Sequence, residues 1–200
     1  MTTNTNTNTA NDTNTANGTR TMNVSTAEVS EVSEVSEAAG STGTLATSGV
    51  AENIRLDFGK SAPKVFRALI GFDAAAREEL DPALVELIQI RASHLNHCAY
   101  CLHMHTNDAR KAGESEDRLH MVAVWREAPH FFSERERAAL ALTEAVTLVA
   151  AGGVPDDVYA EAAAQFDDRE LARILALIFA INMWNRVALS TAKRAGTDQR

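Results

Sequence analysis

Cys98 and Cys101 are the two cysteines of this 200-residue chain, and they form a Cys-x-x-Cys pair. His105 follows four residues after Cys101, and Glu86 lies twelve residues before Cys98. Two thiols at this spacing can close a disulfide, and a thiolate is a nucleophile and a metal ligand. The stretch 86–113 is therefore where chemistry is expected, and the rest of the chain is expected to support it.

Helical geometry places the three side chains on one face. At about 100° per residue, Cys98 and His105 fall on almost the same line, and Cys101 lies about 60° from the first and about 40° from the second. His103 points to the opposite side. A helix start beside a histidine favours a thiolate, and Glu86 on the preceding helix can accept a proton.

These groups suit reduction of a peroxide. A thiolate attacks a peroxide oxygen and becomes a sulfenic acid, which a second thiol converts to a disulfide with release of water. Zinc is the rival, because His94, Cys98, Cys101 and His105 make a Cys₂His₂ set by count. Structural zinc sites usually take ligands from two separated segments, so we predict a redox pair and no metal.

Two helices carry these residues. Asp81 and Pro82 mark a helix start that reaches about His94. Asn96 and His97 break it, and a second helix begins near Cys98 and stops at Gly113.

The other segments from residue 54 onward also have helical apolar spacing. Ser133 and Glu136 form a capping box, and Asp167 caps a long last helix. Further helices are predicted over 62–79, 115–125, 133–149, 155–166 and 170–193. No stretch alternates with a period of two, so the fold class is all-α.

The first 51 residues differ in composition. Residues 1–21 are almost entirely Thr and Asn, and 28–37 repeat Glu-Val-Ser. Such segments have little apolar surface to offset the entropy of ordering. We predict a disordered tail over 1–51 and one helical domain over 52–200.

Composition limits the classes of function. The net charge of −8, with no Lys/Arg-rich run, argues against a nucleic-acid binder. No secretory signal is evident, and the apolar run 171–183 contains Arg173 and Asn182 and is too short to span a bilayer. We therefore expect a soluble, cytoplasmic protein. The last helix is apolar nearly all round, which predicts a homo-oligomer, with a large hydrophobic core in a monomer as the alternative.

Residues 55–195 resemble the alkylhydroperoxidase D-like branch of the carboxymuconolactone decarboxylase superfamily. The most specific match is Glu86, the segment Cys-Ala-Tyr-Cys, then His105, Asp108-Ala-Arg and Gly113. The segments 125–127, 134–149 and 181–186 are also similar to this branch.

The resemblance implies an all-α fold that forms trimers or hexamers, and a thiol-dependent peroxidase acting on organic hydroperoxides or hydrogen peroxide. It implies that Cys101 is the peroxidatic thiol, Cys98 the resolving thiol, and Glu86 with His105 the proton relay. We expect no metal, haem or flavin, because the cysteine pair is itself the redox centre, and the resemblance suggests that an external dithiol such as a lipoyl or thioredoxin-like partner regenerates it. Well-characterised members carry His just before the second cysteine, where this chain has Tyr100, a poor base at neutral pH.

Alternatives remain at this stage. Helix-terminus reasoning favours Cys98 as the attacking thiol, whereas the resemblance favours Cys101. Lactone decarboxylation is the other chemistry of the superfamily, but it does not need a cysteine pair. A third possibility is a non-catalytic module in which the disulfide is a redox switch. A redox switch stops after one equivalent of peroxide, whereas an enzyme consumes many, so a measurement of turnover distinguishes the two.

Overall fold

The computed structural model describes residues 54–198, in which every regular element is a helix. The all-α prediction is confirmed, while the predicted tail over 1–51 lies outside the described residues. The helices are α1 (Phe58–Ser61), α2 (Pro63–Arg77), α3 (Pro82–Leu95), α4 (Ala99–Lys111), α5 (Glu116–Met121), α6 (Glu134–Thr147), α7 (Val149–Gly152), α8 (Asp156–Gln165) and α9 (Asp168–Ser190), with short 3₁₀ turns η1 (Val122–Val124) and η2 (Pro129–Phe131).

The predicted caps are present at three helix starts. The Asp81 carboxylate accepts a hydrogen bond from the Ala83 N–H at 3.0 Å, and the Asp167 carboxylate accepts one from Glu170 at 2.8 Å. Ser133 begins α6 with a complete capping box. These side chains satisfy N–H groups that a helix leaves without partners, which explains why the chain starts helices there.

Several predicted helices end earlier than expected: the helix over 62–79 ends at Arg77, and the helix over 115–125 ends at Met121. Two others are informative. The segment 133–149 is divided at Leu148 into α6 and α7, and α9 ends at Ser190 instead of Lys193. At the second point Ala192 has a φ of 58°, a left-handed conformation that no helix can continue through. Backbone geometry, which apolar spacing does not report, sets both ends.

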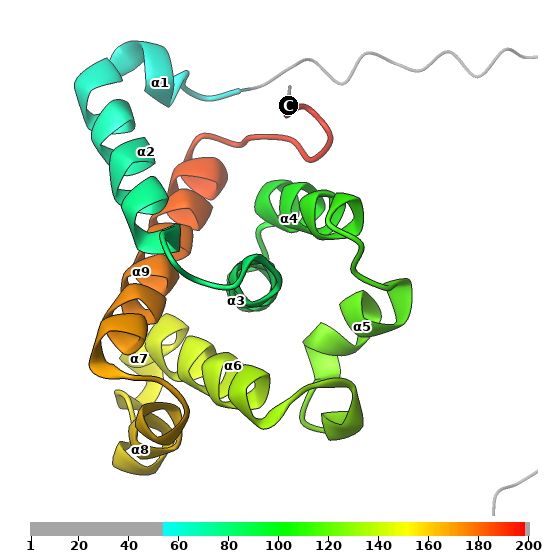
Figure 1. The fold of residues 1–200 in the computed structure, drawn as a ribbon. Helices are drawn as coiled ribbons and strands as arrows, with labels where there is room; N and C mark the ends of the chain where they lie inside the picture. The colour runs from blue at the N-terminus through cyan, green and yellow to red at the C-terminus, as the bar shows by residue number, and fades with distance from the viewer. Residues whose placement is uncertain (1–53, 199–200) are drawn as a thin grey trace, which may run out of the picture. The chain divides into compact units, whose positions relative to one another are not determined.

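Helix α3 is the centre of the domain. Figure 1 looks down its axis, with α4, α6 and α9 around it. Its buried residues Ile88, Ile90 and Ala92 are fully enclosed. Because α3 and α4 follow one another and pack side by side, residues at corresponding levels of the two helices can touch.

Helix α9 is long and apolar enough to cross a membrane by length and composition alone. In the fold it packs against α2, α3 and α6, and Ile174, Leu177 and Ile178 are completely buried. It also carries the buried amide of Asn185. This packing makes α9 part of the core of the domain, with 44% of its most apolar window buried.

Candidate active site

A tight turn between α3 and α4 places the first cysteine. His97 has a φ of 54°, and the Cys98 N–H donates to the Ser93 carbonyl at 2.9 Å. This is a Schellman motif, in which the residue after the left-handed position bonds back to the last turn. Cys98 thereby becomes the N-cap of α4, and Cys101 follows in the first turn of the helix.

The two cysteines are not joined by a disulfide in this structure, and both are buried. Each residue is only 1% exposed. The Cys101 thiol donates a hydrogen bond to the Cys98 sulfur, which lowers the pKa of Cys98 to about 6. The same bond, followed by burial, raises the pKa of Cys101. The backbone N–H groups of Cys101 and Tyr100 further lower the pKa of Cys98. The pair therefore loses its first proton at Cys98.

His105 and Glu86 are brought together as the sequence predicts. His105 Nδ1 lies 2.9 Å from Glu86 Oε2, and the imidazole is almost fully buried. A carboxylate only accepts hydrogen bonds, so Nδ1 carries the proton and Nε2 of the neutral ring can act as a base. This is the arrangement that general acid–base chemistry requires.

Arg77 and Asp73 extend this pair in a way that sequence reasoning missed. Arg77 Nε donates to Asp73 Oδ2 at 2.8 Å, and Arg77 Nη1 lies 3.5 Å from Glu86 Oε1. The guanidinium therefore stands between two carboxylates and holds Glu86 toward His105. Asp73 Oδ1 is buried and has no hydrogen-bond partner among the described residues. The one sequence signal was their spacing of four on a predicted helix, which is common on solvated faces.

Asn185 is a second residue that sequence reasoning did not single out. Its side chain is fully buried; Oδ1 accepts from Asn96 at 2.9 Å, and Nδ2 donates to Ser93 at 3.1 Å. Its amide also lowers the pKa of both cysteines, alongside their larger mutual effect. A polar residue in an otherwise apolar core helix was the available signal.

Cys101 and His105 line a cavity of about 310 Å³, which we call the thiol cavity. Tyr100, on the same helix, lies in the wall, so this neighbour of Cys101 faces the site. Cys98 is not among the lining residues. The remaining wall is formed by Phe66, Ile70, Asp73, Arg77, Met104, Trp184, Val187, Ala188 and Lys193. Access to the cavity therefore favours Cys101 as the attacking thiol, whereas the lower pKa favours Cys98.

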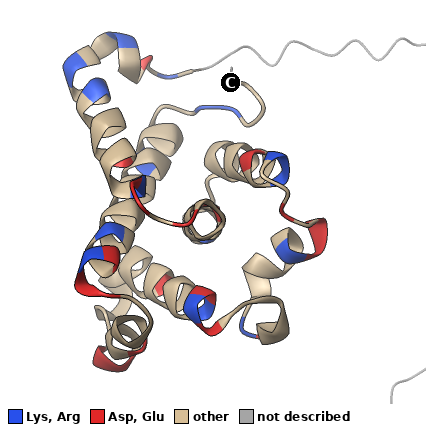
Figure 2. Cartoon of the chain, viewed as in Figure 1, with Lys and Arg blue, Asp and Glu red and all other residues tan. Residues whose placement is uncertain are grey.

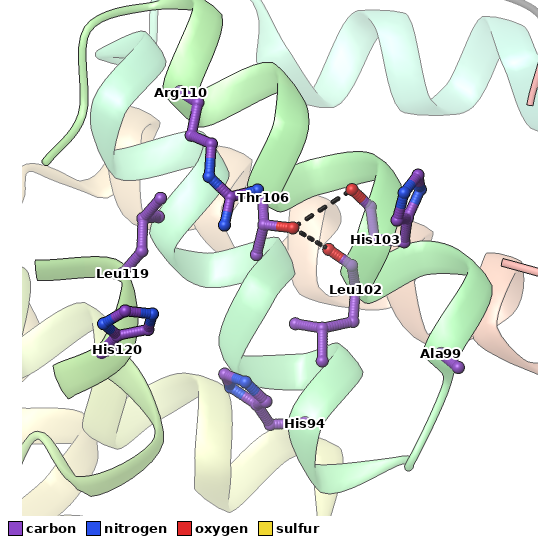
Figure 3. A pocket seen from close by; sticks show the side chains of 8 residues that line it. All are labelled: His94, Ala99, Leu102, His103, Thr106, Arg110, Leu119 and His120. Atoms are coloured by element: carbon purple, nitrogen blue, oxygen red, sulfur yellow. Dashed lines mark hydrogen bonds between the residues drawn. The ribbon is translucent and has the colours of Figure 1, made fainter. Parts of the chain in front are cut away.

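A second cavity of about 400 Å³ lies against another face of α4, and we call it the histidine cavity (Figure 3). His94, His103 and His120 line it together with Ala99, Leu102, Thr106, Arg110 and Leu119. His94 lines the histidine cavity and not the thiol cavity, so the four residues of the zinc alternative do not all face one cavity. Within residues 54–198, no group of three or more His, Cys, Asp or Glu side chains is arranged to hold a metal ion.

Comparison with known proteins identifies the family. Residues 63–145 match the carboxymuconolactone decarboxylase family model. Over 144 residues the chain is 34% identical to the uncharacterized protein YdfG of Bacillus subtilis (strain 168), covering 72% of this chain and 97% of the relative. The chain belongs to the carboxymuconolactone decarboxylase family.

Structural likeness places this family member in the AhpD-like branch. A crystal structure from Agrobacterium tumefaciens, of a protein of unknown function described as a putative antioxidant defence protein AhpD, is 36% identical with a TM-score of 0.69. The match covers 72% of this chain and 99% of that one. An AhpD-core protein from Ralstonia eutropha JMP134 shares the fold, at 22% identity and a TM-score of 0.61, over 70% of this chain and 74% of the other.

Proposed function

We propose that this protein is a thiol-dependent peroxidase that reduces organic hydroperoxides or hydrogen peroxide through Cys98 and Cys101. One observation carries the proposal: Cys101 opens into the largely apolar thiol cavity beside the buried His105–Glu86 pair. A thiol, a base and room for an organic group meet at that point. The AhpD-like relatives support the same class of chemistry.

In the proposed first step, the Cys101 sulfur attacks the terminal oxygen of the hydroperoxide. His105 Nε2 takes the thiol proton, and Glu86 stabilises the imidazolium that forms. The oxygen–oxygen bond breaks, the sulfur becomes a sulfenic acid, and the alkoxide leaves as an alcohol with the proton that His105 returns. The sulfur is oxidised by two electrons, and the peroxide is reduced by two.

In the second step, the Cys98 thiolate attacks the sulfenic sulfur of Cys101. A Cys98–Cys101 disulfide forms, and the hydroxide that leaves becomes water with the proton that Cys98 gave to His105 when its thiolate formed. The backbone N–H groups of Cys101 and Tyr100, which also lower the pKa of Cys98, remain in place after Cys101 is oxidised and favour the attacking thiolate. An external dithiol, either lipoyl or thioredoxin-like, then reduces the disulfide by exchange, and no metal, haem or flavin takes part.

We also propose a cytoplasmic location and a homo-oligomer, either a trimer or a hexamer. A cysteine pair that must return to the dithiol fits a reducing compartment.

The homo-oligomer is supported by an exposed apolar surface. Leu148, Val149 and Phe179 are about half exposed, and the Asn182–Thr147 hydrogen bond of 3.0 Å brings their elements side by side. Apolar side chains of this size are expected to be covered in an assembly. A stable monomer in sedimentation velocity would exclude the proposed homo-oligomer.

The test is consumption of a hydroperoxide by metal-free protein with a dithiol reductant. We expect many turnovers for the native chain and none for Cys101→Ser, with Thr106→Ala in the histidine cavity as a matched control that keeps activity. Consumption that stops after one equivalent would replace the peroxidase with a redox switch. No consumption, with conversion of a carboxymuconolactone instead, would favour the decarboxylase alternative.

A further inference from the structure

Lys193 is a cation in the wall of the thiol cavity that the proposed mechanism does not use. Its side chain is half-buried, and Nζ lies 5.1 Å from the Tyr100 ring centroid and 6.0 Å from that of Phe66. Tyr100 immediately precedes Cys101, so the ammonium group stands close to the proposed reaction centre. Lys193 also follows the family-matched residues 63–145, so the family match does not account for it.

A backbone motif directs Lys193 toward the cavity. The Lys193 N–H donates to the Ala188 carbonyl at 2.9 Å, and the Ala192 N–H donates to Leu189 at 3.3 Å. With Ala192 at a φ of 58°, these bonds form a Schellman motif at the end of α9. The motif turns the chain back across its last turn, so the position of Lys193 is fixed by the fold.

The positive charge of Lys193 has no close counter-charge in residues 54–198. No carboxylate of these residues lies within 4 Å of the Lys193 Nζ. The charge of Lys193 helps to lower the pKa of Asp57, but the ion pair of Asp57, at 3.2 Å, is with Lys60. Arg77, the other cation of the cavity, already pairs with two carboxylates. An ammonium group against apolar walls is costly unless it is paired, and the Tyr100 and Phe66 rings offset only part of that cost. The charge of Lys193 acts on Asp57 and on the Cys101 thiol from a distance, but no carboxylate of the described residues forms an ion pair with it, so an anion bound in the cavity could do so.

The charges in the cavity differ along α2. Phe66 lies beside Lys193, whereas Asp73 and Arg77 follow seven and eleven residues later on the same helix, about 10 to 16 Å away along its axis. Figure 2 shows the same trend, with basic residues in the segment after α9 and acidic residues between α2 and α3. Apolar side chains such as Ile70 lie between. An anionic group is therefore attracted at the Lys193 end and repelled by Asp73 at the other.

We propose that Lys193 binds the carboxylate of an organic hydroperoxide that has an apolar body, and so determines the substrate class of the thiol cavity. The inference rests on the proposed peroxidase function. The apolar walls hold the hydrocarbon part, Lys193 holds the carboxylate, and Cys101 meets the peroxide oxygen.

The kinetic test compares linoleic acid hydroperoxide with its methyl ester, which differ only in the anionic group. For Lys193→Met we expect KM for the acid to rise about tenfold, the effect of losing one charge-assisted hydrogen bond, with little change for the ester. Lys193→Arg should restore much of the preference, and Arg194→Met, a change at the exposed neighbour, should leave it intact. Equal losses for both substrates would overturn the proposal and place Lys193 with the thiolate, and no loss for either would also overturn it.

A binding test keeps this inference separate from the peroxidase itself. Linoleate, which has no hydroperoxide, is titrated into Cys101→Ser protein while tryptophan fluorescence is followed. We expect binding that weakens about tenfold in the Cys101→Ser, Lys193→Met double variant. Lys193-dependent binding without peroxide turnover would uphold Lys193 as a carboxylate-binding residue but refute the peroxidase function, and with it a hydroperoxide as the ligand. Turnover without Lys193-dependent binding would do the reverse.

Discussion

The thiol cavity and the histidine cavity share helix α4 but differ in how their titratable groups are paired. In the thiol cavity, His105 is buried and bonded to Glu86, which Arg77 holds in turn. In the histidine cavity, His103 and His120 are largely exposed, with carboxylates at 3.5 and 3.7 Å. The second cavity holds more histidines, yet the first is arranged for proton transfer. Pairing and burial, more than residue type, distinguish a site from a surface hollow.

His94, in the histidine cavity, also differs from His105 in how its ring is paired. Its Nδ1 is buried without a hydrogen-bond partner among the described residues, and burial, followed by the charge of Arg91, lowers its pKa. The ring is therefore favoured in its neutral form and is not linked to a carboxylate. His105 has the carboxylate that His94 lacks, which is why we assign the relay to His105.

The largest effect that tests this comparison is expected at the relay itself. His105→Gln removes the base beside Cys101, and kcat/KM for a hydroperoxide should fall about 100-fold. The matched control is His103→Gln, on the opposite face of α4, which should remain near the native value. Thermal melts would check that both variants fold. An equal fall in kcat/KM for both variants would contradict the assignment of the proton relay to the thiol cavity.

The next effect concerns the shared thiol proton. Cys98 has a pKa of about 6 because the Cys101 thiol donates to its sulfur, so the thiolate forms as pH rises through about 6 and is lost below it. Cys101→Ala removes that donor and should raise the pKa of Cys98 toward the ordinary value near 8.5. Thiolate absorbance in the ultraviolet, followed against pH, measures the shift. An unchanged profile would mean that the helix terminus alone sets the pKa.

A smaller loss is expected at Arg77. Arg77→Gln leaves Asp73 and Glu86 without the charge between them, and the position of Glu86 relative to His105 loosens. We expect kcat/KM to fall about tenfold, the effect of one charge-assisted contact, with partial rescue by Arg77→Lys. Arg169→Gln, which breaks an exposed ion pair with Glu79, is the control. A full loss of folding in Arg77→Gln would show a structural role instead.

The smallest effect is expected for His94. His94→Leu replaces a buried ring nitrogen that has no partner with an apolar group, and such changes are close to neutral. Activity should be unchanged, and the free energy of unfolding in urea should stay within about 1 kcal/mol or increase. A marked loss of activity would instead give the histidine cavity a part in the chemistry.

The sequence predicts local features of this fold well and distant ones poorly. Caps at Asp81, Ser133 and Asp167 depend on neighbouring residues, so their pattern is visible in the chain. His105 and Glu86 belong to consecutive helices joined by a short turn, which makes their meeting predictable. Arg77 and Lys193 reach the same cavity from α2 and from beyond α9, and no local spacing connects them to the cysteines.

Two similar turns illustrate what local patterns miss. The Cys98 N–H bonds back to Ser93, and the Lys193 N–H bonds back to Ala188. Both turns use a non-glycine residue with positive φ, His97 and Ala192. Glycine usually marks such turns in a sequence, so the turn after α9 was not expected, and its helix was predicted to continue to Lys193. The His97 turn was found only because Asn96 and His97 interrupt the apolar pattern.

The central claim is that Cys101, and not Cys98, meets the peroxide. The most direct measurement is the intact mass of Cys98→Ser and Cys101→Ser protein after one equivalent of hydroperoxide. We predict that Cys98→Ser gains one oxygen atom as a sulfenic acid, that Cys101→Ser does not change, and that the native chain loses two hydrogen atoms as the disulfide forms. Oxygen gained by Cys101→Ser but not by Cys98→Ser would contradict the account and make the low-pKa thiol of Cys98 the attacking group.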